Sequence, residues 1–242
     1  MTERSVFKIN PDDRVAVLTG AGISAESGIK TFRDSNGLWE NHSVEEVATP
    51  EGFARNPELV WEFYRQRYQQ MLTVKPNSGH YALKELEEYL GDNFLLITQN
   101  IDGLHSLAGS KNLLEMHGTI RQAFCAKCRT IYPTDEVIGE KGIPHCEKCS
   151  ALLRPDVVWF GEMPYHMEEI INFLQNLDYF ITVGTSGVVY PAAQFLITAK
   201  YSGSTTIGIN LETPDNYRFI DEFHQGLSGK ILPDLVRLWT ER

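Results

Sequence analysis

The chain lacks any long hydrophobic run and any sign of a secretion signal. No stretch of about 18 consecutive apolar residues occurs, which argues against a membrane-spanning helix. The first ten residues, MTERSVFKIN, do not show the basic, then apolar, then small-residue order of a signal peptide. With 42% hydrophobic residues over 242 positions, the chain is nevertheless long and apolar enough to bury a core. We therefore expect a soluble, cytoplasmic protein that does not bind membranes.

Basic residues are also scarce. The chain has 22 Lys and Arg against 32 Asp and Glu, which gives a formal net charge of -10. Nonspecific binding to nucleic acid requires Lys and Arg to neutralise phosphates, so this balance argues against a nucleic-acid partner. It is compatible with partners that are basic peptides.

Cysteine is rare, and its four copies are not scattered. They form two C-x-x-C pairs separated by 17 residues, Cys125 with Cys128 and Cys146 with Cys149. This spacing is typical of a structural zinc ion, because two tight turns can direct four thiolates at one metal. Two disulfides or four unrelated thiols are the alternatives, and disulfides are disfavoured without a secretion signal. A four-thiolate site has no open position for a catalytic water, so catalysis must come from other residues.

Short apolar runs alternate with amphipathic patterns along most of the chain. The strand candidates are Val15–Thr19, Phe94–Thr98, Tyr179–Val183 and residues 206–210, and the helix candidates include Ser78–Leu90 and residues 167–177. Continuous apolar runs are typical of strands buried on both faces of a parallel sheet. The alternation predicts an α/β fold with a doubly wound parallel sheet. Residues 34–75, helical around 56–72, and residues 118–158 do not fit this rhythm and are interpreted as inserts.

A glycine-rich turn directly follows the first predicted strand. Residues 20–25, GAGISA, satisfy the G-x-G-x-x-A form of the dinucleotide fingerprint, in which glycines let backbone amides approach a pyrophosphate. An ordinary turn before a helix is the alternative. A dehydrogenase would next show a strand that ends in Asp or Glu. Residues 29–39 contain no predicted strand, and Glu40 lies in the wrong context, so hydride transfer is disfavoured.

Polar residues follow three further apolar segments. TQNIDGLH at 98–105 ends the second predicted strand, His117 and Gly118 follow the apolar segment LLEM, and NLE at 210–212 ends a late strand. The carboxyl ends of parallel strands are where such folds bind ligands. Asn100 and Asp102 can also be turn formers, and a lone histidine after an apolar segment is more often structural than catalytic.

The order of these motifs along nearly the whole chain resembles the sirtuin family. The motifs that carry the resemblance are GAGIS at 20–24, TFR at 31–33, GLW at 37–39, TQNIDGLH at 98–105, HG at 117–118, the two cysteine pairs, GTS at 184–186 and NLE at 210–212. Sirtuins are NAD-dependent protein deacylases. The resemblance implies a Rossmann-type NAD-binding domain at residues 1–33, 76–117 and 159–242. It implies a small domain made of a helical insert at 34–75 and a zinc ribbon at 118–158.

The resemblance also implies the chemistry and the residues that perform it. In sirtuins NAD is an electrophile: the acyl oxygen attacks the ribose C1′ as nicotinamide leaves, and the products are nicotinamide, free lysine and O-acyl-ADP-ribose. His117 would be the general base, with Asn100 as the second catalytic residue. The implied cofactor-binding residues are Gly20, Ala21, Gly22, Ile23, Ser24, Glu26, Phe32, Arg33, Trp39, Gln99, Asn100, Ile101, Asp102, Gly184, Thr185, Ser186, Asn210, Leu211, Glu212 and Ser228. Lys30 and Asp34 depart from the family pattern, in which many members have Pro and Gly.

Two further segments match the places where sirtuins bind the peptide substrate. They pair with its backbone as a short strand, so the bonds are mainly to the main chain. The residues implied are Phe160, Gly161, Glu162, Val188 and Tyr190.

The acyl group is expected to contact Tyr64 and Arg67. These residues are three positions apart, so a helix places them on one face, where a hydroxyl and a guanidinium together can hold a carboxylate. Class III sirtuins carry this pair and remove succinyl and malonyl groups, and acetyl groups also fit such a pocket. A solvated polar helix face around Arg65 and Arg67 is the alternative.

Two other functions are compatible with parts of the sequence. A mono-ADP-ribosyltransferase cleaves the same bond of NAD but transfers ADP-ribose to a protein side chain. A nucleic-acid-binding zinc ribbon would need a basic face, for which the candidates are Arg121, Lys127, Arg129, Lys141 and Lys148.

Overall fold

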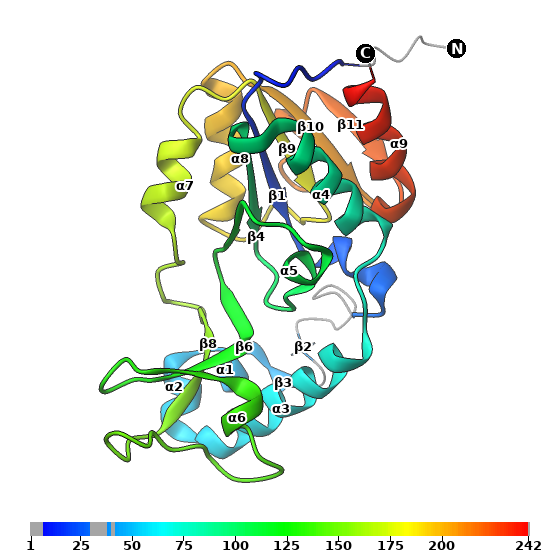
Figure 1. Cartoon of the computed structure of the whole chain (residues 1–242). Coiled ribbons are helices and arrows are strands. Elements are labelled where there is room, and N and C mark those ends of the chain that lie inside the picture. The colour runs from blue at the N-terminus through cyan, green and yellow to red at the C-terminus, as the bar shows by residue number, and fades with distance from the viewer. Residues whose placement is uncertain (1–6, 30–37, 40–41, 242) are drawn as a thin grey trace.

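The computed structural model describes residues 7–29, 38–39 and 42–241, and its largest element is a six-stranded parallel sheet (Figure 1). In spatial order the strands are β11 (Glu222–Gln225), β10 (Thr205–Asn210), β9 (Tyr179–Val183), β1 (Val15–Thr19), β4 (Phe94–Thr98) and β5 (Leu113–Glu115). The chain proceeds from β1 to β4 and β5, and later continues on the other side of β1 with β9, β10 and β11. This order confirms the doubly wound sheet and creates a switch point beside β1.

Helices cover both faces of this sheet because side chains of the central strands alternate between two apolar layers. Val15 and Val17 belong to the layer that contains α4 (Ser78–Leu90) and α9 (Ser228–Thr240). Ala16 and Leu18 belong to the opposite layer, with α7 (Met167–Phe173) and α8 (Ala192–Tyr201). Every residue of β1 is buried, as the continuous apolar run predicts. Among the described residues, no helix combines the length and apolarity needed to cross a bilayer.

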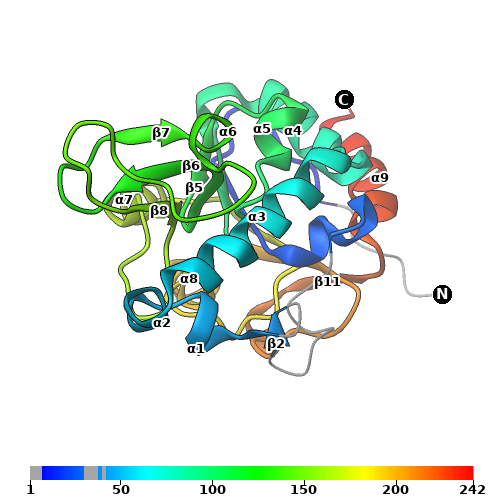
Figure 2. The same cartoon turned by 90° about the horizontal axis from the view of Figure 1, so that it is seen from below.

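A second core lies below the sheet in Figure 1 and is built by two segments that are remote in sequence. One segment forms α1 (Val44–Val47), α2 (Pro50–Arg55) and α3 (Pro57–Thr73), and the other forms β6 (Gly118–Cys125), β7 (Ile131–Pro133), α6 (Thr134–Val137) and β8 (Leu153–Val157). The three strands make an antiparallel sheet in the order β7-β6-β8. Trp61 of α3 packs in this core and donates its indole N–H to the Leu153 carbonyl at 2.9 Å. Figure 2 shows both segments from below.

Two expectations about secondary structure were wrong in detail. The helix expected over 167–177 ends at Phe173, and Asn176 adopts a positive φ of 64°, which an α-helix cannot accommodate. No strand was expected at 29–39, but β2 (Leu38–Trp39) pairs with β3 (His42–Ser43), and a two-residue ribbon leaves no hydrophobic pattern to detect. In the described ranges, the remaining short elements are α5 (Leu104–Ala108) and the 3₁₀ turns η1 (Ala21–Ile23), η2 (Ala25–Ser27), η4 (Gly91–Asn93) and η5 (Tyr217–Phe219).

Candidate active site and metal centre

The carboxyl ends of the parallel strands meet at the lower edge of the large sheet in Figure 1. Thr19, at the end of β1, lies in register with Thr98 of β4 and Val183 of β9, and Thr98 lies in register with Glu115 of β5. Four parts of the chain follow these strand ends and therefore lie next to one another at this edge. They are residues 20–26, 99–102 and 184–186 and His117. Open α/β sheets bind ligands at this edge.

The glycine loop requires glycine because it packs against another backbone. The Gly22 N–H donates to the Gly184 carbonyl at 2.9 Å, and the Gly20 N–H donates to the Val183 carbonyl at 3.0 Å. A Cβ atom on Gly22 would lie 2.6 Å from the Gly184 Cα atom, which no real side chain tolerates. The glycines of the fingerprint therefore allow the segment after β1 to pack directly against the segment after β9.

Three backbone donors fit the anionic part of a dinucleotide. In the described part of the chain, the N–H groups of Ala21, Thr185 and Ser186 make no hydrogen bond to another residue. Side chains hold this segment in place, because Gln99 Nε2 donates to Thr185 Oγ1 at 3.1 Å and Asn210 Nδ2 donates to the Thr185 carbonyl at 2.9 Å. Unpaired N–H groups in turns after strands are suitable donors to a pyrophosphate.

Ser24 is the centre of a buried hydrogen-bond network beneath the glycine loop. Its Oγ donates to Asp102 Oδ2 at 2.7 Å and accepts from Asn100 Nδ2 at 3.2 Å. The backbone N–H of Asn77 donates to His80 Nδ1, so the proton of His80 is on Nε2, which faces Ser24 Oγ at 3.5 Å. Burial lowers the pKa of His80 to about 4, so its imidazole is neutral in this network.

His80 was not among the residues expected at the site, and His105 was expected there only as part of the TQNIDGLH motif. Their rings lie 4.8 Å apart, and His105 Nε2 contacts Thr19 Oγ1 at 3.0 Å. The signal for His80 was available, because Asn77 and His80 have the spacing of a capping box at the start of α4. Nothing in the sequence indicates that α5 brings His105 against that ring.

His117 has the geometry of a general base. Its Nδ1 lies 3.0 Å from the Gln99 carbonyl oxygen, which can only accept a hydrogen bond, so Nδ1 carries the proton and Nε2 has a free lone pair. Burial lowers the pKa of His117, while the bond to Gln99 acts in the opposite direction. The following Gly118 has φ 76°, and a Cβ atom there would lie 2.1 Å from the Asp156 carbonyl oxygen. The His-Gly pair thus combines an imidazole whose Nε2 can accept a proton with a close backbone contact.

A group of charged residues surrounds the strand end that leads to His117. Burial raises the pKa of Glu115 to about 7, and the charges of Asp102 and Asp156 raise it further against the opposing effect of Arg121. Burial also raises the pKa of Asp102, although its bonds from Leu104 and Ser24 oppose this. Glu115 therefore titrates near neutrality, and the sequence did not indicate it.

The residues expected at the adenosine end are only partly brought together. Ser228 meets Glu26, which was expected in the NAD-binding loop, because Glu26 Oε2 accepts the Gly229 N–H at 2.6 Å and lies 3.5 Å from Ser228 Oγ. Leu211 and Glu212 lie on the exposed turn after β10. Phe32, Arg33, Lys30 and Asp34 lie outside the described residues, and for Trp39 only the backbone in β2 is described.

Tyr64 and Arg67 lie on α3, with Tyr64 1% exposed and Arg67 half-buried. Tyr64 Oη accepts the indole N–H of Trp159 at 2.9 Å. Burial raises the pKa of Tyr64, which keeps the hydroxyl protonated, and the nearby charge of Arg67 only partly opposes this. The alternative of a solvated polar face is wrong for Arg65, which is buried and donates to the Gly139 and Gly142 carbonyls at 3.1 and 2.9 Å.

The residues expected to contact the peptide are exposed on two loops. Phe160, Val188 and Tyr190 are 50%, 49% and 67% exposed. Glu162 differs from them because its carboxylate forms two bonds with Arg154, at 2.7 and 2.8 Å, and accepts the Trp159 N–H at 2.9 Å. Its side chain therefore holds the loop together.

The four cysteines fit one zinc ion. Their Sγ atoms all lie within 4.8 Å of one another. The Cys125–Cys149 and Cys128–Cys146 sulfurs are 3.5 Å apart, close to the spacing of about 3.8 Å that tetrahedral zinc–thiolate bonds of about 2.3 Å require. The site lies beside the second core, and the whole length of β6, from Gly118 to Cys125, separates it from His117, which agrees with a structural role.

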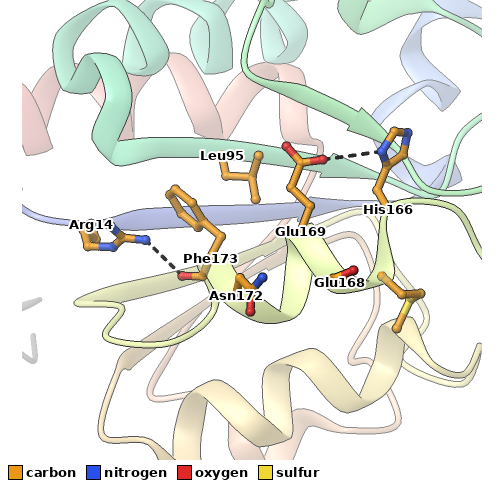
Figure 3. Close-up of a pocket in the computed structure, with 8 residues that line it drawn as sticks. Arg14, Leu95, His166, Glu168, Glu169, Asn172 and Phe173 are labelled. Carbon is orange, nitrogen blue, oxygen red and sulfur yellow. Dashed lines mark hydrogen bonds and ion pairs between the residues drawn. The ribbon is translucent and has the colours of Figure 1, made fainter.

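A separate surface cavity of about 740 Å³ lies along α7, where this helix faces Arg14 and Leu95 of the sheet region. It is lined by Arg14, Leu95, His166, Met167, Glu168, Glu169, Asn172 and Phe173. Figure 3 shows the contact between His166 Nδ1 and the Glu169 carboxylate and the bond from Arg14 to the Phe173 carbonyl at its wall. None of the described residues predicted to bind NAD, substrate or metal lines it, so its size does not identify the active site.

Known proteins resemble this chain over nearly its whole length. A protein of Pasteurella multocida (strain Pm70) named NAD-dependent protein deacylase is 53% identical over 222 residues, which cover 91% of this chain and 95% of that protein. A protein of Salmonella typhimurium (strain LT2) with the same name is 50% identical over 236 residues, which cover 97% and 86% of the two chains.

Solved structures agree with these relatives. The complex of a Sir2 homologue with NAD has a TM-score of 0.86 and 40% identity and covers 93% of this chain and 88% of its own. Sir2 bound to an acetylated peptide has a TM-score of 0.82 and 30% identity, and covers 93% and 92%. Residues 20–191 match the family model described as the Sir2 family, and with relatives at about half identity the chain belongs to the Sir2 family.

Proposed function

We propose that the chain is an NAD-dependent protein-lysine deacylase with His117 as its general base. The observation that carries the proposal is the bond between His117 Nδ1 and the Gln99 carbonyl, because it leaves Nε2 able to accept a proton. This nitrogen belongs to the sheet edge where the glycine loop and Asn100 also lie. The names of the closely similar bacterial relatives support the same activity.

The residues at this edge fit NAD in distinct roles. The N–H groups of Ala21, Thr185 and Ser186 would hold the pyrophosphate, and Gln99 to Asp102 would contact the ribose and nicotinamide. When bound, NAD supplies an electrophilic ribose carbon from which nicotinamide leaves. The other proposed NAD contacts are Gly20, Gly22, Ile23, Ser24, Glu26, Phe32, Arg33, Trp39, Gly184, Asn210, Leu211, Glu212 and Ser228.

His117 would take the proton of a ribose hydroxyl. Because burial lowers its pKa, the imidazole is neutral near pH 7 and ready to accept at Nε2. Once protonated, the ring keeps its Nδ1–H on the Gln99 carbonyl, so the charge forms in a fixed orientation. Asn100 is anchored through Nδ2 to the Gly20 carbonyl at 3.1 Å, and its Oδ1 would orient the reacting ribose.

We further propose that acidic acyl groups, succinyl and malonyl, are preferred and that acetyl groups are also removed. Tyr64 and Arg67 share one face of α3, and the charge of Arg67 acts on both Tyr64 and Asp102, so Arg67 lies toward the sheet edge that carries the catalytic groups. A guanidinium and a protonated hydroxyl are suitable partners for the acyl carboxylate. Phe160, Gly161, Glu162, Val188 and Tyr190 would border the peptide itself.

The activity is tested by mass spectrometry of succinyl-lysine and acetyl-lysine peptides with and without NAD. Loss of the acyl mass together with nicotinamide release is the expected result, and His117→Ala should abolish it while NAD still binds. His166→Ala, at the separate cavity, is the matched control and should keep full activity. Wild-type turnover by the His117→Ala variant would refute the assigned base, and ADP-ribose mass on the protein would indicate an ADP-ribosyltransferase instead.

The acyl preference is tested with Arg67→Met. We expect desuccinylation to fall far more than deacetylation, because only the succinyl group presents a carboxylate to the lost guanidinium. Arg55→Met, at the exposed end of α2, is the control for loss of one positive charge. Equal losses on both peptides would contradict the carboxylate role.

Three broader features belong to the same proposal. The NAD-binding domain would comprise residues 1–33, 76–117 and 159–242, and the small domain would comprise residues 34–75 and 118–158. This division is in keeping with the two separate cores. The partners are acyl-lysine proteins rather than nucleic acid or membranes. The bacterial relatives support a cytoplasmic location.

A further inference from the structure

Trp159 connects the loop proposed to bind the peptide with the helix proposed to bind the acyl group. It directly precedes Phe160, and its indole N–H reaches across to Tyr64 of α3 at a distance of 2.9 Å. Trp159 is 2% exposed and Tyr64 is 1% exposed, so the bond is shielded from water. A buried bond of this kind constrains both side chains more strongly than a solvated one.

The surroundings of Trp159 hold its ring in one position. The guanidinium carbon of Arg154 lies 3.6 Å from the ring centre, and the Phe53 ring packs at 5.3 Å between centroids. Glu162 also restrains Trp159, because it binds Arg154 and accepts the backbone N–H of Trp159. Contacts outside the acyl site therefore fix the position of the Trp159 indole N–H, which donates to the Tyr64 hydroxyl.

The bond from Trp159 determines the direction in which the Tyr64 hydroxyl can donate its proton. A tyrosine hydroxyl has one proton to donate and lone pairs with which to accept. Because an indole N–H can only donate, it occupies a lone pair of Tyr64 and directs the hydroxyl proton elsewhere. The high pKa of the buried hydroxyl keeps that proton in place.

We propose that Trp159 is a positioning residue for acid-acyl selectivity, whose indole N–H orients Tyr64 as a hydrogen-bond donor toward an acyl carboxylate beside Arg67. This inference rests on the deacylase function and acyl preference proposed above. It assigns to the Trp159 ring nitrogen a role in choosing between acyl groups, separate from the chemical step. An acetyl group has no carboxylate, so it gains nothing from this orientation.

The test compares Trp159→Phe with the wild type on succinyl-lysine and acetyl-lysine peptides. Loss of one buried hydrogen bond should lower the ratio of desuccinylation to deacetylation kcat/KM by about three- to ten-fold, mainly through KM. In a Tyr64→Phe background the same substitution should have no further effect on the ratio, because the hydroxyl that it orients is gone.

Trp61→Phe is the matched control. Trp61 is 1% exposed in the same core and donates its indole N–H to the Leu153 carbonyl at 2.9 Å, but it does not contact the Tyr64 hydroxyl through this bond. It should lower the melting temperature and leave the acyl ratio unchanged. An equal fall of the ratio in Trp61→Phe, or an unchanged ratio in Trp159→Phe, would overturn the proposal.

A measurement on the unmodified chain covers the case in which Trp159→Phe does not fold. The chain has four tryptophans, so the indole N–H signal of Trp159 can be resolved by ¹⁵N NMR. A succinyl-lysine peptide should shift this signal more than an acetyl-lysine peptide does, and equal shifts would refute the positioning role.

If Tyr64→Phe and Arg67→Met leave the ratio of desuccinylation to deacetylation unchanged, acid-acyl recognition itself is wrong, and the proposed role of Trp159 is wrong with it. If they lower the ratio and Trp159→Phe does not, only the positioning role is refuted.

Discussion

Replacement of Glu115 by Gln should make the protein more stable at alkaline pH and leave its stability unchanged at acidic pH. Glu115 ends β5, its carboxyl group makes no hydrogen bond within the described residues, and it lies near the charges of Asp102 and Asp156. Burial and these charges raise its pKa from 4.5 to about 7. The folded protein thus binds more protons here than the unfolded chain does between these two values. The free energy of unfolding therefore falls as the pH rises through this interval.

The magnitude follows from the size of the pKa change. Each pH unit between the two pKa values corresponds to about 1.4 kcal/mol, so the charged carboxylate costs at most about 3 kcal/mol above pH 7. Glu115 is only partly buried, and solvent screening reduces this cost to about 2 kcal/mol. Gln has the shape of the protonated acid and carries no charge. For a chain of this length, 2 kcal/mol raises the melting temperature by about 5 °C.

Thermal unfolding at about pH 5 and about pH 8 measures this effect directly. The Glu115→Gln variant should melt with the wild type near pH 5 and about 5 °C higher near pH 8. The exposed Glu85→Gln on α4 is the control for loss of one negative charge, and its shift should be small at both pH values. An equal stabilisation by Glu85→Gln at pH 8, or no pH dependence for Glu115→Gln, would refute the reasoning.

Two further predictions concern the second core. Arg65→Met should destabilise the protein by about 2–4 kcal/mol, because it removes the donor to the Gly139 and Gly142 carbonyls and leaves them unpaired; an unchanged melting temperature would contradict this. Cys146→Ser should lower the melting temperature and release zinc that is otherwise retained at one ion per chain, because metal binding in such sites contributes folding free energy. Metal analysis after dialysis checks the second prediction, and an undiminished zinc content in the variant would count against the site.

The central strands could be predicted from sequence, and the edge strands could not. Val15–Thr19 and Phe94–Thr98 are continuous apolar runs because both faces of the sheet bury them. β11 at the sheet edge, Glu222–Gln225, is partly exposed and reads EFHQ, without the apolar run or clean alternation that identifies a strand. Edge strands form because a neighbour offers hydrogen bonds, and that neighbour is not visible in the local sequence.

Polar residues of the site were also hard to predict when their partners lie far away in the sequence. Glycine motifs and cysteine spacing were readable because they encode local turns. Arg65 looked like part of a solvated face because its partners, the carbonyls of 138–142, come from the other insert. His80 looked like an ordinary helix residue for the same reason, since Ser24 lies 56 positions away. Buried polar groups are defined by tertiary partners, so periodicity on their own element says little about them.

The zinc module can influence catalysis through the backbone that carries His117. The Val158 N–H donates to the His117 carbonyl at 2.9 Å, and the Ile120 N–H donates to the Ile101 carbonyl at 3.0 Å. These donors lie beside β8 and in β6, the strands that the cysteine turns hold together. Because Gly118 also packs directly against the Asp156 carbonyl, a shift of β8 cannot leave the His117 backbone in place. Loss of zinc should therefore lower turnover by displacing His117, the proposed base, even though the closed thiolate site takes no part in the reaction.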